Sequence, residues 1–360
     1  MIEYENLGKV NQPFFEAYRK KFEDTLLTGW YILGNNVKAF ENDFARFTGA
    51  KHCVGVASGL DALSLALNSL EFPENSEVIV PSNTYIATIL PIINNGMKPI
   101  LVEPDINTYN IDPDKIEDKI TPATRAIMLV HLYGKCCCMD KIMDLAREHH
   151  ISIIEDCAQS HGTKFKNQVA GTFGEFGAHS FYPTKNLGAL GDAGAVTTNN
   201  TTFAEKIKAL RNYGSNVKYV NEYVGYNSRL DEIQAGFLSV KLEALNRINQ
   251  HKRDLAKLYL TYLKDDFIKP IIDHDYYDVY HIFNIRHPQR DKLREFLLNH
   301  DIKTEIHYPI PPHKQKAMKG IIEGDYPISE EIHSTTLSLP ISYSHTSDDI
   351  LKVIETLNSF

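Results

Sequence analysis

The sequence predicts an α/β fold with a mainly parallel sheet, followed by a smaller α+β region. Through the first two-thirds of the chain, short apolar runs alternate with amphipathic stretches, which is typical of consecutive βαβ units. From about residue 246 this alternation gives way to helical stretches mixed with isolated strand-like runs. We therefore expect a large α/β domain at 1–245 and a small C-terminal domain at 246–360. The strands expected in the large domain are 52–56, 77–80, 98–102, 125–131, 152–155, 178–182 and 195–198.

The composition is that of an ordinary globular protein. Of the 360 residues, 43% are hydrophobic and 23% are charged, and the formal net charge is −8. A negative chain argues against nucleic acid or an anionic membrane as its general partner. The first residues lack the basic start and apolar stretch of a signal peptide, and no apolar run approaches membrane-spanning length. We expect a cytoplasmic protein.

The five cysteines predict reduced thiols. Their number is odd, and three of them, Cys136, Cys137 and Cys138, are adjacent. A disulfide framework needs an even set of cysteines, and a zinc site needs paired ligands at a spacing that this triplet lacks. We expect no metal site.

A helix is expected to begin near Gly59, directly after the first strand. Leu60, Leu63, Leu67 and Leu70 recur at helical spacing and so lie on one face. The first amides of such a helix lack partners within it, and the positive end of its dipole suits an anion such as phosphate. Every parallel α/β fold has helix starts of this kind, so position alone leaves phosphate binding as one option among several.

Lys185 lies in the stretch with the strongest chemical signal, 177–198. A strand-like run ending at Tyr182 is followed by Pro183, Lys185 and three glycines before the next strand. Proline sets a bend, and glycines let the backbone approach a ligand closely. A lysine held between a buried strand and a glycine-rich loop is well placed to form a Schiff base with a carbonyl. An ordinary loop lysine accounts for this stretch equally well.

Asp156 favours the chemical interpretation. It closes a short β-branched run, 151–156, with the character of a buried parallel strand. The carboxyl ends of parallel strands are where open α/β sheets bind ligands. A carboxylate there can keep a pyridine nitrogen protonated, and the protonated ring of pyridoxal phosphate is an electron sink. Together, Asp156 and Lys185 therefore indicate pyridoxal phosphate as the cofactor.

Seven motifs, in order over nearly the whole chain, resemble the pyridoxal-phosphate-dependent nucleotide-sugar aminotransferases of the DegT/DnrJ/EryC1/StrS family. The resemblance implies the aspartate aminotransferase fold (fold type I), with a mostly parallel seven-stranded sheet in the large domain. The motifs are Gly29-Trp-Tyr-Ile-Leu-Gly34, Ser58-Gly-Leu-Asp-Ala-Leu63, Pro81-Ser-Asn-Thr-Tyr-Ile-Ala-Thr88, His131-Leu-Tyr-Gly134, Glu155-Asp-Cys-Ala-Gln-Ser-His-Gly162, Ser180-Phe-Tyr-Pro-Thr-Lys-Asn186 and Gly225-Tyr-Asn-Ser-Arg-Leu-Asp-Glu-Ile-Gln234.

The resemblance also implies roles for residues at matching positions. Lys185 is expected to bind the cofactor as a Schiff base and Asp156 to contact its ring nitrogen, and both are expected to be catalytic. The family often has threonine where this chain has Leu60, so Leu60 is expected to contribute only its backbone amide. The cofactor contacts implied beyond these two are Gly59, Leu60, Asp61 and Ser180 at the phosphate, Tyr85 stacked on the ring, Gln159 beside the ring, and Asn227 at the phosphate of the partner subunit's cofactor.

Asn227 thereby implies a homodimer with shared active sites. In the family this asparagine reaches across the subunit interface, so each site is completed in trans. The sequence at 228–231, Ser-Arg-Leu-Asp, fits a capping box. The helix that it starts is expected to continue toward Leu260 and to carry the chain into the small domain.

The reaction implied is transfer of an amino group from glutamate to a nucleotide-linked keto-sugar, with Lys185 moving the proton in both half-reactions. Segments 210–219, 223–232 and 307–315 resemble the subgroup acting at C3 of dTDP-3-keto-6-deoxyhexoses. The products of that subgroup enter surface polysaccharides or glycosylated natural products. His307 and Tyr308 directly precede the proline-rich stretch at 309–312, which could hold them at the mouth of the active site. An ordinary surface loop accounts for this segment equally well. The substrate contacts considered are Tyr182, Lys218, Arg229, His307 and Tyr308.

The main alternative is amination at C4 of a UDP- or dTDP-4-keto-6-deoxy sugar. The nearest rival activity within the family is that of the sugar dehydratases, which carry histidine at the position of Lys185, so this lysine disfavours them. A non-catalytic regulatory protein that binds the cofactor is disfavoured by the intact set of Lys185, Asp156, Gln159 and Ser180. A nicotinamide-binding protein is disfavoured because no strand is followed by G-x-G-x-x-G.

Overall fold

A seven-stranded sheet forms the centre of the molecule, and the computed structural model describes all residues, 1–360. All neighbouring strands pair in parallel except at β9, which is antiparallel to both of its neighbours. The predicted α/β fold with a mostly parallel sheet is therefore confirmed. The strands, in their order across the sheet, are β1 (His52–Val56), β9 (Gly194–Thr198), β8 (Phe176–Ser180), β5 (Ser152–Asp156), β4 (Thr124–Val130), β2 (Glu77–Pro81) and β3 (Lys98–Val102).

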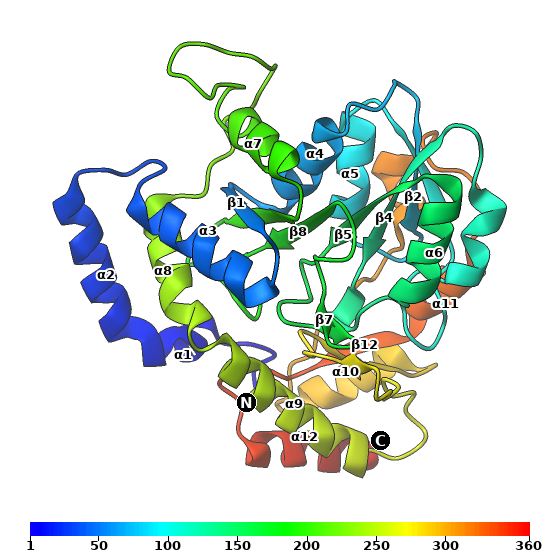
Figure 1. Cartoon of the computed structure of the whole chain (residues 1–360). Coiled ribbons are helices and arrows are strands. Elements are labelled where there is room, and N and C mark those ends of the chain that lie inside the picture. Colours follow the sequence, from blue (N-terminus) through cyan, green and yellow to red (C-terminus); the bar gives the residue numbers. More distant parts are fainter.

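Helices cover both faces of this sheet (Figure 1). Successive residues of a strand point to opposite faces, so Ile153 and Ile154 of β5 lie in two different apolar cores. None of the helices combines the length and the apolar composition needed to cross a bilayer. The helices on one face are α4 (Gly59–Ser69), α5 (Ile86–Asn94) and α7 (Thr201–Leu210), and those on the other are α3 (Asn35–Thr48), α6 (Met139–His149) and α8 (Glu232–Leu242).

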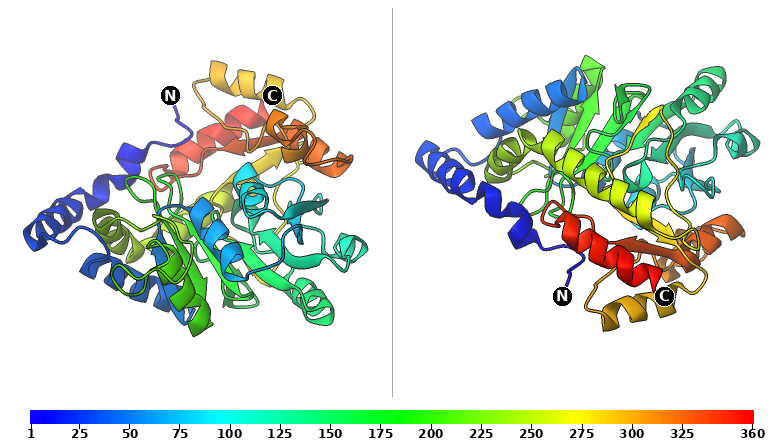
Figure 2. Two further views of the ribbon diagram at one scale, coloured as in Figure 1. Left: turned by 90° about the horizontal axis from the view of Figure 1, so that it is seen from above. Right: turned by 90° about the horizontal axis from the view of Figure 1, so that it is seen from below.

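The C-terminal part has an apolar core of its own. Ile2 belongs to this core and pairs with Ile302, and Figure 2 shows both chain ends at this part of the molecule. The N-terminal residues thus return to the C-terminal part, and the division at residue 245 stays a prediction. The elements of this part are α9 (Leu245–Tyr262), β11 (Phe283–Arg286), α10 (Arg290–Asn299), β12 (Thr336–Leu339) and α12 (Ser347–Asn358).

Short elements connect these parts. β11 and β12 form an antiparallel pair. A small three-stranded sheet pairs the strand at 276–277 with two short strands in the segment after β5. The remaining elements are α1 (Leu7–Asn11), α2 (Phe15–Thr28), α11 (Pro327–Thr335), β6 (Lys164–Phe165), β7 (Gln168–Val169), β10 (Tyr276–Tyr277) and 3₁₀ turns at Gln12–Phe14, Pro113–Lys115, Glu117–Lys119, Leu132–Gly134, Pro312–Lys314 and Lys316–Met318.

The predicted capping box at Ser228 is wrong. α8 begins at Glu232, with Asp231 at its N-cap and no side-chain capping bond. The buried Ser228 hydroxyl instead donates to the Asp61 carboxylate (2.7 Å) and accepts from the amide of Ala57 (3.2 Å). A capping box is a local pattern, and here partners distant in the sequence satisfy the serine.

Two predicted boundaries also differ from the structure. The helix expected to reach Leu260 without interruption is divided, because α8 ends at Leu242 and α9 begins at Leu245. The strand predicted at 178–182 is β8, which ends at Ser180, so Tyr182 already belongs to the loop that carries Lys185.

Glu232 links α8 to the start of α3. Its carboxylate is buried and accepts from the amides of Gly34 (2.9 Å), Asn36 (2.5 Å) and Val37 (3.1 Å). Amides at a helix start have no partner within their own helix, so this carboxylate caps α3 from a distant part of the chain. A Cβ at Gly34 would lie 2.7 Å from Glu232 Oε1, and only glycine leaves room for this approach.

Replacing Glu232 by alanine is expected to lower the free energy of unfolding by about 2–4 kcal/mol, because several amides lose a buried charged acceptor. Glu232→Gln keeps an acceptor oxygen and should lose less. Urea denaturation followed by circular dichroism measures both, and a loss below about 0.5 kcal/mol for Glu232→Ala, the size of a surface effect, would contradict this role.

Candidate active site

A cavity of about 640 Å³ lies at the carboxyl ends of the parallel strands. Its wall includes the last residues of three strands: Val130 of β4, Asp156 of β5 and Ser180 of β8. The start of α4, the start of α5 and the C-terminal part of the chain complete it. The cavity therefore brings together segments from most of the chain. The predicted site residues that line it are Gly59, Leu60, Tyr85, Asp156, Gln159, Ser180, Tyr182, Lys185, His307 and Tyr308.

Asp156 is buried at the end of β5, and both of its carboxylate oxygens are bonded. Oδ2 accepts from the Thr88 hydroxyl (2.8 Å), and Oδ1 accepts from the Ala158 amide (3.0 Å). Burial raises the pKa of Asp156, while these two hydrogen bonds and the charge of Lys185 oppose the rise. Thr88 lies on α5, and nothing local in the sequence marks it as a partner of Asp156.

Lys185 is half-buried in the loop between β8 and β9 and lines the same cavity as Asp156. Burial lowers the pKa of its amine to about 8, although the charges of Asp156 and Glu5 act in the opposite direction. An amine with this pKa is partly unprotonated near neutral pH. It can therefore attack a carbonyl carbon and accept a proton.

The start of α4 meets Ser180 at one end of the cavity. Gly59 packs so closely that a Cβ there would lie 2.5 Å from the Ser180 Cβ. Asp61 does not line the cavity, and its amide donates to the Ser58 hydroxyl (3.1 Å). The amides of Gly59 and Leu60 precede the first bond of the helix, which runs from Ala62 to the Ser58 carbonyl. Two helix-start amides beside a serine hydroxyl fit a phosphate group.

Gln159 connects the large sheet to residues of the C-terminal part. Its Nε2 donates to the Tyr308 hydroxyl (3.2 Å), and its Oε1 accepts from the Tyr133 amide (2.6 Å). The Tyr133 hydroxyl in turn donates to the carbonyl of His307. Tyr308 stands with its ring centroid 5.0 Å from that of the half-exposed Tyr85. These contacts hold the segment at 307–308 at the cavity, where burial lowers the pKa of His307 to about 4.

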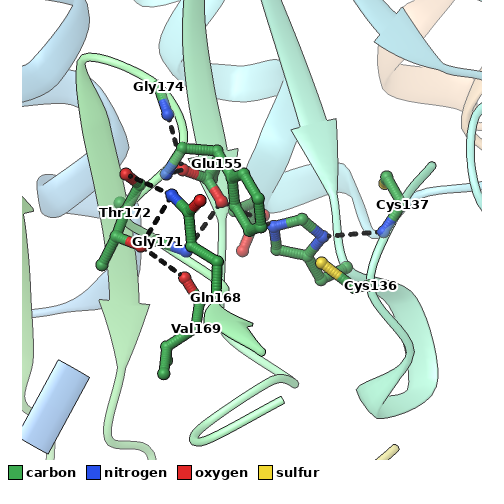
Figure 3. A network of polar contacts seen from close by, with 12 residues as sticks. Cys136, Cys137, Glu155, Gln168, Val169, Gly171, Thr172 and Gly174 are labelled. Atoms are coloured by element: carbon green, nitrogen blue, oxygen red, sulfur yellow. Dashed lines mark hydrogen bonds and ion pairs between the residues drawn. The ribbon is translucent and has the colours of Figure 1, made fainter. Parts of the chain in front are cut away.

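Glu155, beside Asp156, is part of a separate buried network (Figure 3). Its carboxylate accepts from the amides of Gly171 (2.7 Å), Phe173 (2.7 Å) and Gly174 (2.9 Å). The Nδ1 of His131 accepts from a backbone amide, so its Nε2 donates to Glu155 (2.9 Å). Glu155 therefore anchors the loop after β7 to the strand that ends in Asp156.

Besides Asp61, three predicted site residues lie outside the cavity, in or beside the loop between α7 and α8. Asn227 is exposed and pairs with Asn212. Arg229 donates to the Asn212 side chain (2.9 Å), and the exposed Lys218 lies over the Tyr219 ring. Within one subunit, the structure does not bring these residues to Lys185.

Comparison with known proteins gives concordant results. Residues 15–358 match the DegT/DnrJ/EryC1/StrS aminotransferase family. The chain is 49% identical to dTDP-3-amino-3,6-dideoxy-alpha-D-galactopyranose transaminase of Aneurinibacillus thermoaerophilus, and the match covers 100% of this chain and 99% of that one.

Two solved structures are similar over nearly the full length of this chain. DesV of S. venezuelae, determined in complex with a ketimine intermediate, has a TM-score of 0.96 and 40% identity, covering 98% of this chain and 96% of that one. NtdA of Bacillus subtilis, with bound cofactor PMP (pyridoxamine phosphate), has a TM-score of 0.91 and 30% identity, covering 98% of this chain and 83% of that one.

The shifted pKa of Lys185 predicts its reactivity. In cofactor-free protein, acetylation of this amine should rise with pH around a midpoint near 8, because only the free base reacts. Asp156→Asn removes a negative charge that raises the pKa, so the midpoint should fall below that of the wild type. Mass spectrometry of the Lys185 peptide measures both midpoints, and an unchanged or higher midpoint in the variant would refute the pairing of the two side chains.

Proposed function

The chain belongs to the DegT/DnrJ/EryC1/StrS aminotransferase family, and on this basis we propose that it moves an amino group from L-glutamate to the C3 keto group of a dTDP-3-keto-6-deoxyhexose. The product would be a dTDP-3-amino-3,6-dideoxyhexose. The enzyme class, a pyridoxal-phosphate-dependent sugar aminotransferase, follows from the family and the relatives. The choice of sugar is supported by full-length similarity to a transaminase whose name specifies this kind of product.

The observation that carries the chemistry is the single cavity shared by Lys185 and Asp156. A carboxylate there could contact a ring nitrogen, and the adjacent amine could condense with an aldehyde. The helix start at Gly59 and Leu60, with the Ser180 hydroxyl, offers donors for a phosphate. Tyr85 and Gln159 line the same cavity and would border the ring. The residues in the cavity thus fit pyridoxal phosphate.

Each residue would have a distinct task. The bound cofactor supplies an electron sink for the charge that develops when a Cα–H bond breaks. Asp156 would hold the proton on the ring nitrogen through its carboxylate. The Nζ of Lys185 would bind the cofactor and then, once free, carry a proton away from Cα of the amino donor and return one in the second half-reaction. An amine pKa of about 8 permits both directions of this transfer near neutral pH.

We place the sugar on the side of the cavity formed by Tyr182, His307 and Tyr308. These side chains line the same cavity as Lys185 and carry hydroxyl and imidazole groups that suit sugar hydroxyls. Lys218 and Arg229 lie outside this chain's cavity, so any contact of theirs with the diphosphate would be made in a partner's site. Products of this type would serve a surface polysaccharide such as an O-antigen, or a glycosylated natural product, and we place the enzyme in the cytoplasm.

A homodimer is proposed on the basis of apolar surface. Leu27 is 81% exposed and Trp30 is 65% exposed at the end of α2. In the loop between α7 and α8, which extends from the body of the molecule in Figure 1, Tyr219 is 88% and Val224 is 94% exposed. Large apolar side chains gathered on projecting segments are typical of association surfaces. Asn227 belongs to this loop and could reach the partner's cavity.

Addition of glutamate to the cofactor-loaded enzyme is expected to bleach the visible absorbance of the bound aldehyde form. Lys185→Ala should still bind the cofactor but lose turnover by about a thousandfold or more, because it lacks the amine that moves the proton. Incubation with glutamate and a panel of 3-keto and 4-keto nucleotide sugars, followed by NMR, then locates the new amine.

The outcomes separate the candidate functions. An amine at C3 of the dTDP-sugar supports the proposal, whereas an amine at C4 favours the alternative aminotransferase. Cofactor binding with no response to glutamate indicates a non-catalytic regulatory protein. Normal turnover by Lys185→Ala would remove this residue from the mechanism.

Shared active sites can be tested by mixing two defective subunits. Asn227→Asp places a negative charge where a phosphate is expected and should impair turnover. If Asn227 acts in trans, a mixed dimer of this variant with Lys185→Ala has one intact site, built from Lys185 of one subunit and Asn227 of the other. About half of the dimers are mixed after random exchange, so activity should return to about a quarter of the wild-type value. The control is Asn227→Asp mixed with itself. No recovery in the mixed sample would show that Asn227 acts within its own subunit or not at all.

A further inference from the structure

Asn186, the residue after Lys185, is held by a buried set of hydrogen bonds. Its Nδ2 donates to the Asn249 side chain (2.8 Å) and to the Val279 carbonyl (3.2 Å). Its Oδ1 accepts from Lys252 Nζ (2.8 Å). All three side chains, Asn186, Asn249 and Lys252, are buried, with 5%, 1% and 4% of their surface exposed. The loop that carries Lys185 is therefore fastened to α9, the helix that supplies both Asn249 and Lys252.

Lys252 has a second hydrogen bond, to the His281 carbonyl (3.0 Å). Burial lowers its pKa, and a neutral lysine amine keeps two N–H donors. Two acceptors, Asn186 Oδ1 and the His281 carbonyl, surround Lys252 Nζ, so a neutral amine can use both of its N–H donors. The arrangement can therefore hold in either protonation state. Buried lysine is costly, and a site that keeps one is expected to use its donors.

A second cavity, of about 420 Å³, lies next to Lys252. Glu5 of the N-terminal segment lines it, as do Thr184 and His281, which also line the active-site cavity. Lys252 lines the second cavity but not the first. It therefore does not line the space for a ligand beside Lys185, and its direct contact with the Lys185 loop is the hydrogen bond to Asn186.

We propose that Lys252 is a positioning residue for Lys185. By bonding Asn186 and the His281 carbonyl, it holds the loop in the conformation that presents the Lys185 amine to the cavity. This inference rests on the proposed function, because the step it affects is capture of the cofactor aldehyde. In that step, Lys185 Nζ forms a bond to the aldehyde carbon, and the carbonyl oxygen leaves as water with the two amine hydrogens.

The test measures capture directly. Cofactor-free wild type and Lys252→Met are mixed with pyridoxal phosphate, quenched with borohydride at set times, and the adduct on Lys185 is quantified by mass spectrometry. Methionine has nearly the same length as lysine but no donors. Capture is expected to slow by about tenfold to a hundredfold, the effect of a misplaced reacting group. Affinity for pyridoxamine phosphate, which has no aldehyde to capture, should be unchanged.

Lys303→Met is the matched control. Lys303 lines the same second cavity but is exposed, so this variant should capture at the wild-type rate. Lys252→Arg, which keeps N–H donors, should recover part of the lost rate. If Lys252→Met does not fold, Asn186→Ser, which removes the acceptor and leaves Lys252 in place, is measured in the same way and should show the same slow capture.

The outcomes distinguish this inference from the proposed function. A wild-type protein that forms no adduct at Lys185 would contradict the function itself. If the wild type forms the adduct and Lys252→Met forms it at the same rate, the positioning role is overturned. Parallel losses of capture, pyridoxamine phosphate affinity and melting temperature would also overturn it, because they would show that Lys252 only stabilises the fold.

Discussion

An amine and a carboxylate that line one cavity are the constraint on which the rest of this structure depends. Burial lowers the pKa of Lys185 and raises that of Asp156, and each charge opposes the shift of the other. A solvated pair would show neither effect to this degree, because water screens charge and removes the cost of burial. The fold therefore partly shields both groups from water while leaving a cavity that both side chains line.

Hydrogen bonds on both sides of the cavity hold Asp156 and the loop of Lys185 in place. Thr88 and the Ala158 amide fix the Asp156 carboxylate, while Glu155 fixes the loop behind it. On the other side, Asn186 ties the loop of Lys185 to α9. These polar groups are bonded, so moving Asp156 or the loop of Lys185 would leave donors or acceptors without partners. Rigid placement of the two groups follows from the cost of breaking these networks.

The C-terminal part of the chain supplies the remaining wall. His307 and Tyr308 are held at the cavity by Tyr133 and Gln159, which lie in the segments that follow β4 and β5. The N-terminal segment also reaches this part, through Ile2, and brings Glu5 close enough to influence Lys185. A residue near the start of the chain thus acts on an amine in its middle, and Figure 2 shows the N-terminus at the C-terminal part of the molecule.

The sequence by itself determined the sheet and the helix start at Gly59, and it predicted that Lys185 and Asp156 would lie at one site, where both line the same cavity. Apolar alternation, helical spacing and the residues at strand ends are local patterns, so they can be read without coordinates. The capping box predicted at Ser228 is wrong for the same reason. The pattern considers only neighbouring residues, whereas the Ser228 hydroxyl bonds to Asp61, far away in the sequence. Only the tertiary structure decided that Thr88 bonds Asp156, that Glu232 caps α3 and that Lys252 holds Asn186. Those contacts join segments far apart in the chain, and buried polar groups choose their partners by position in space rather than by spacing in sequence.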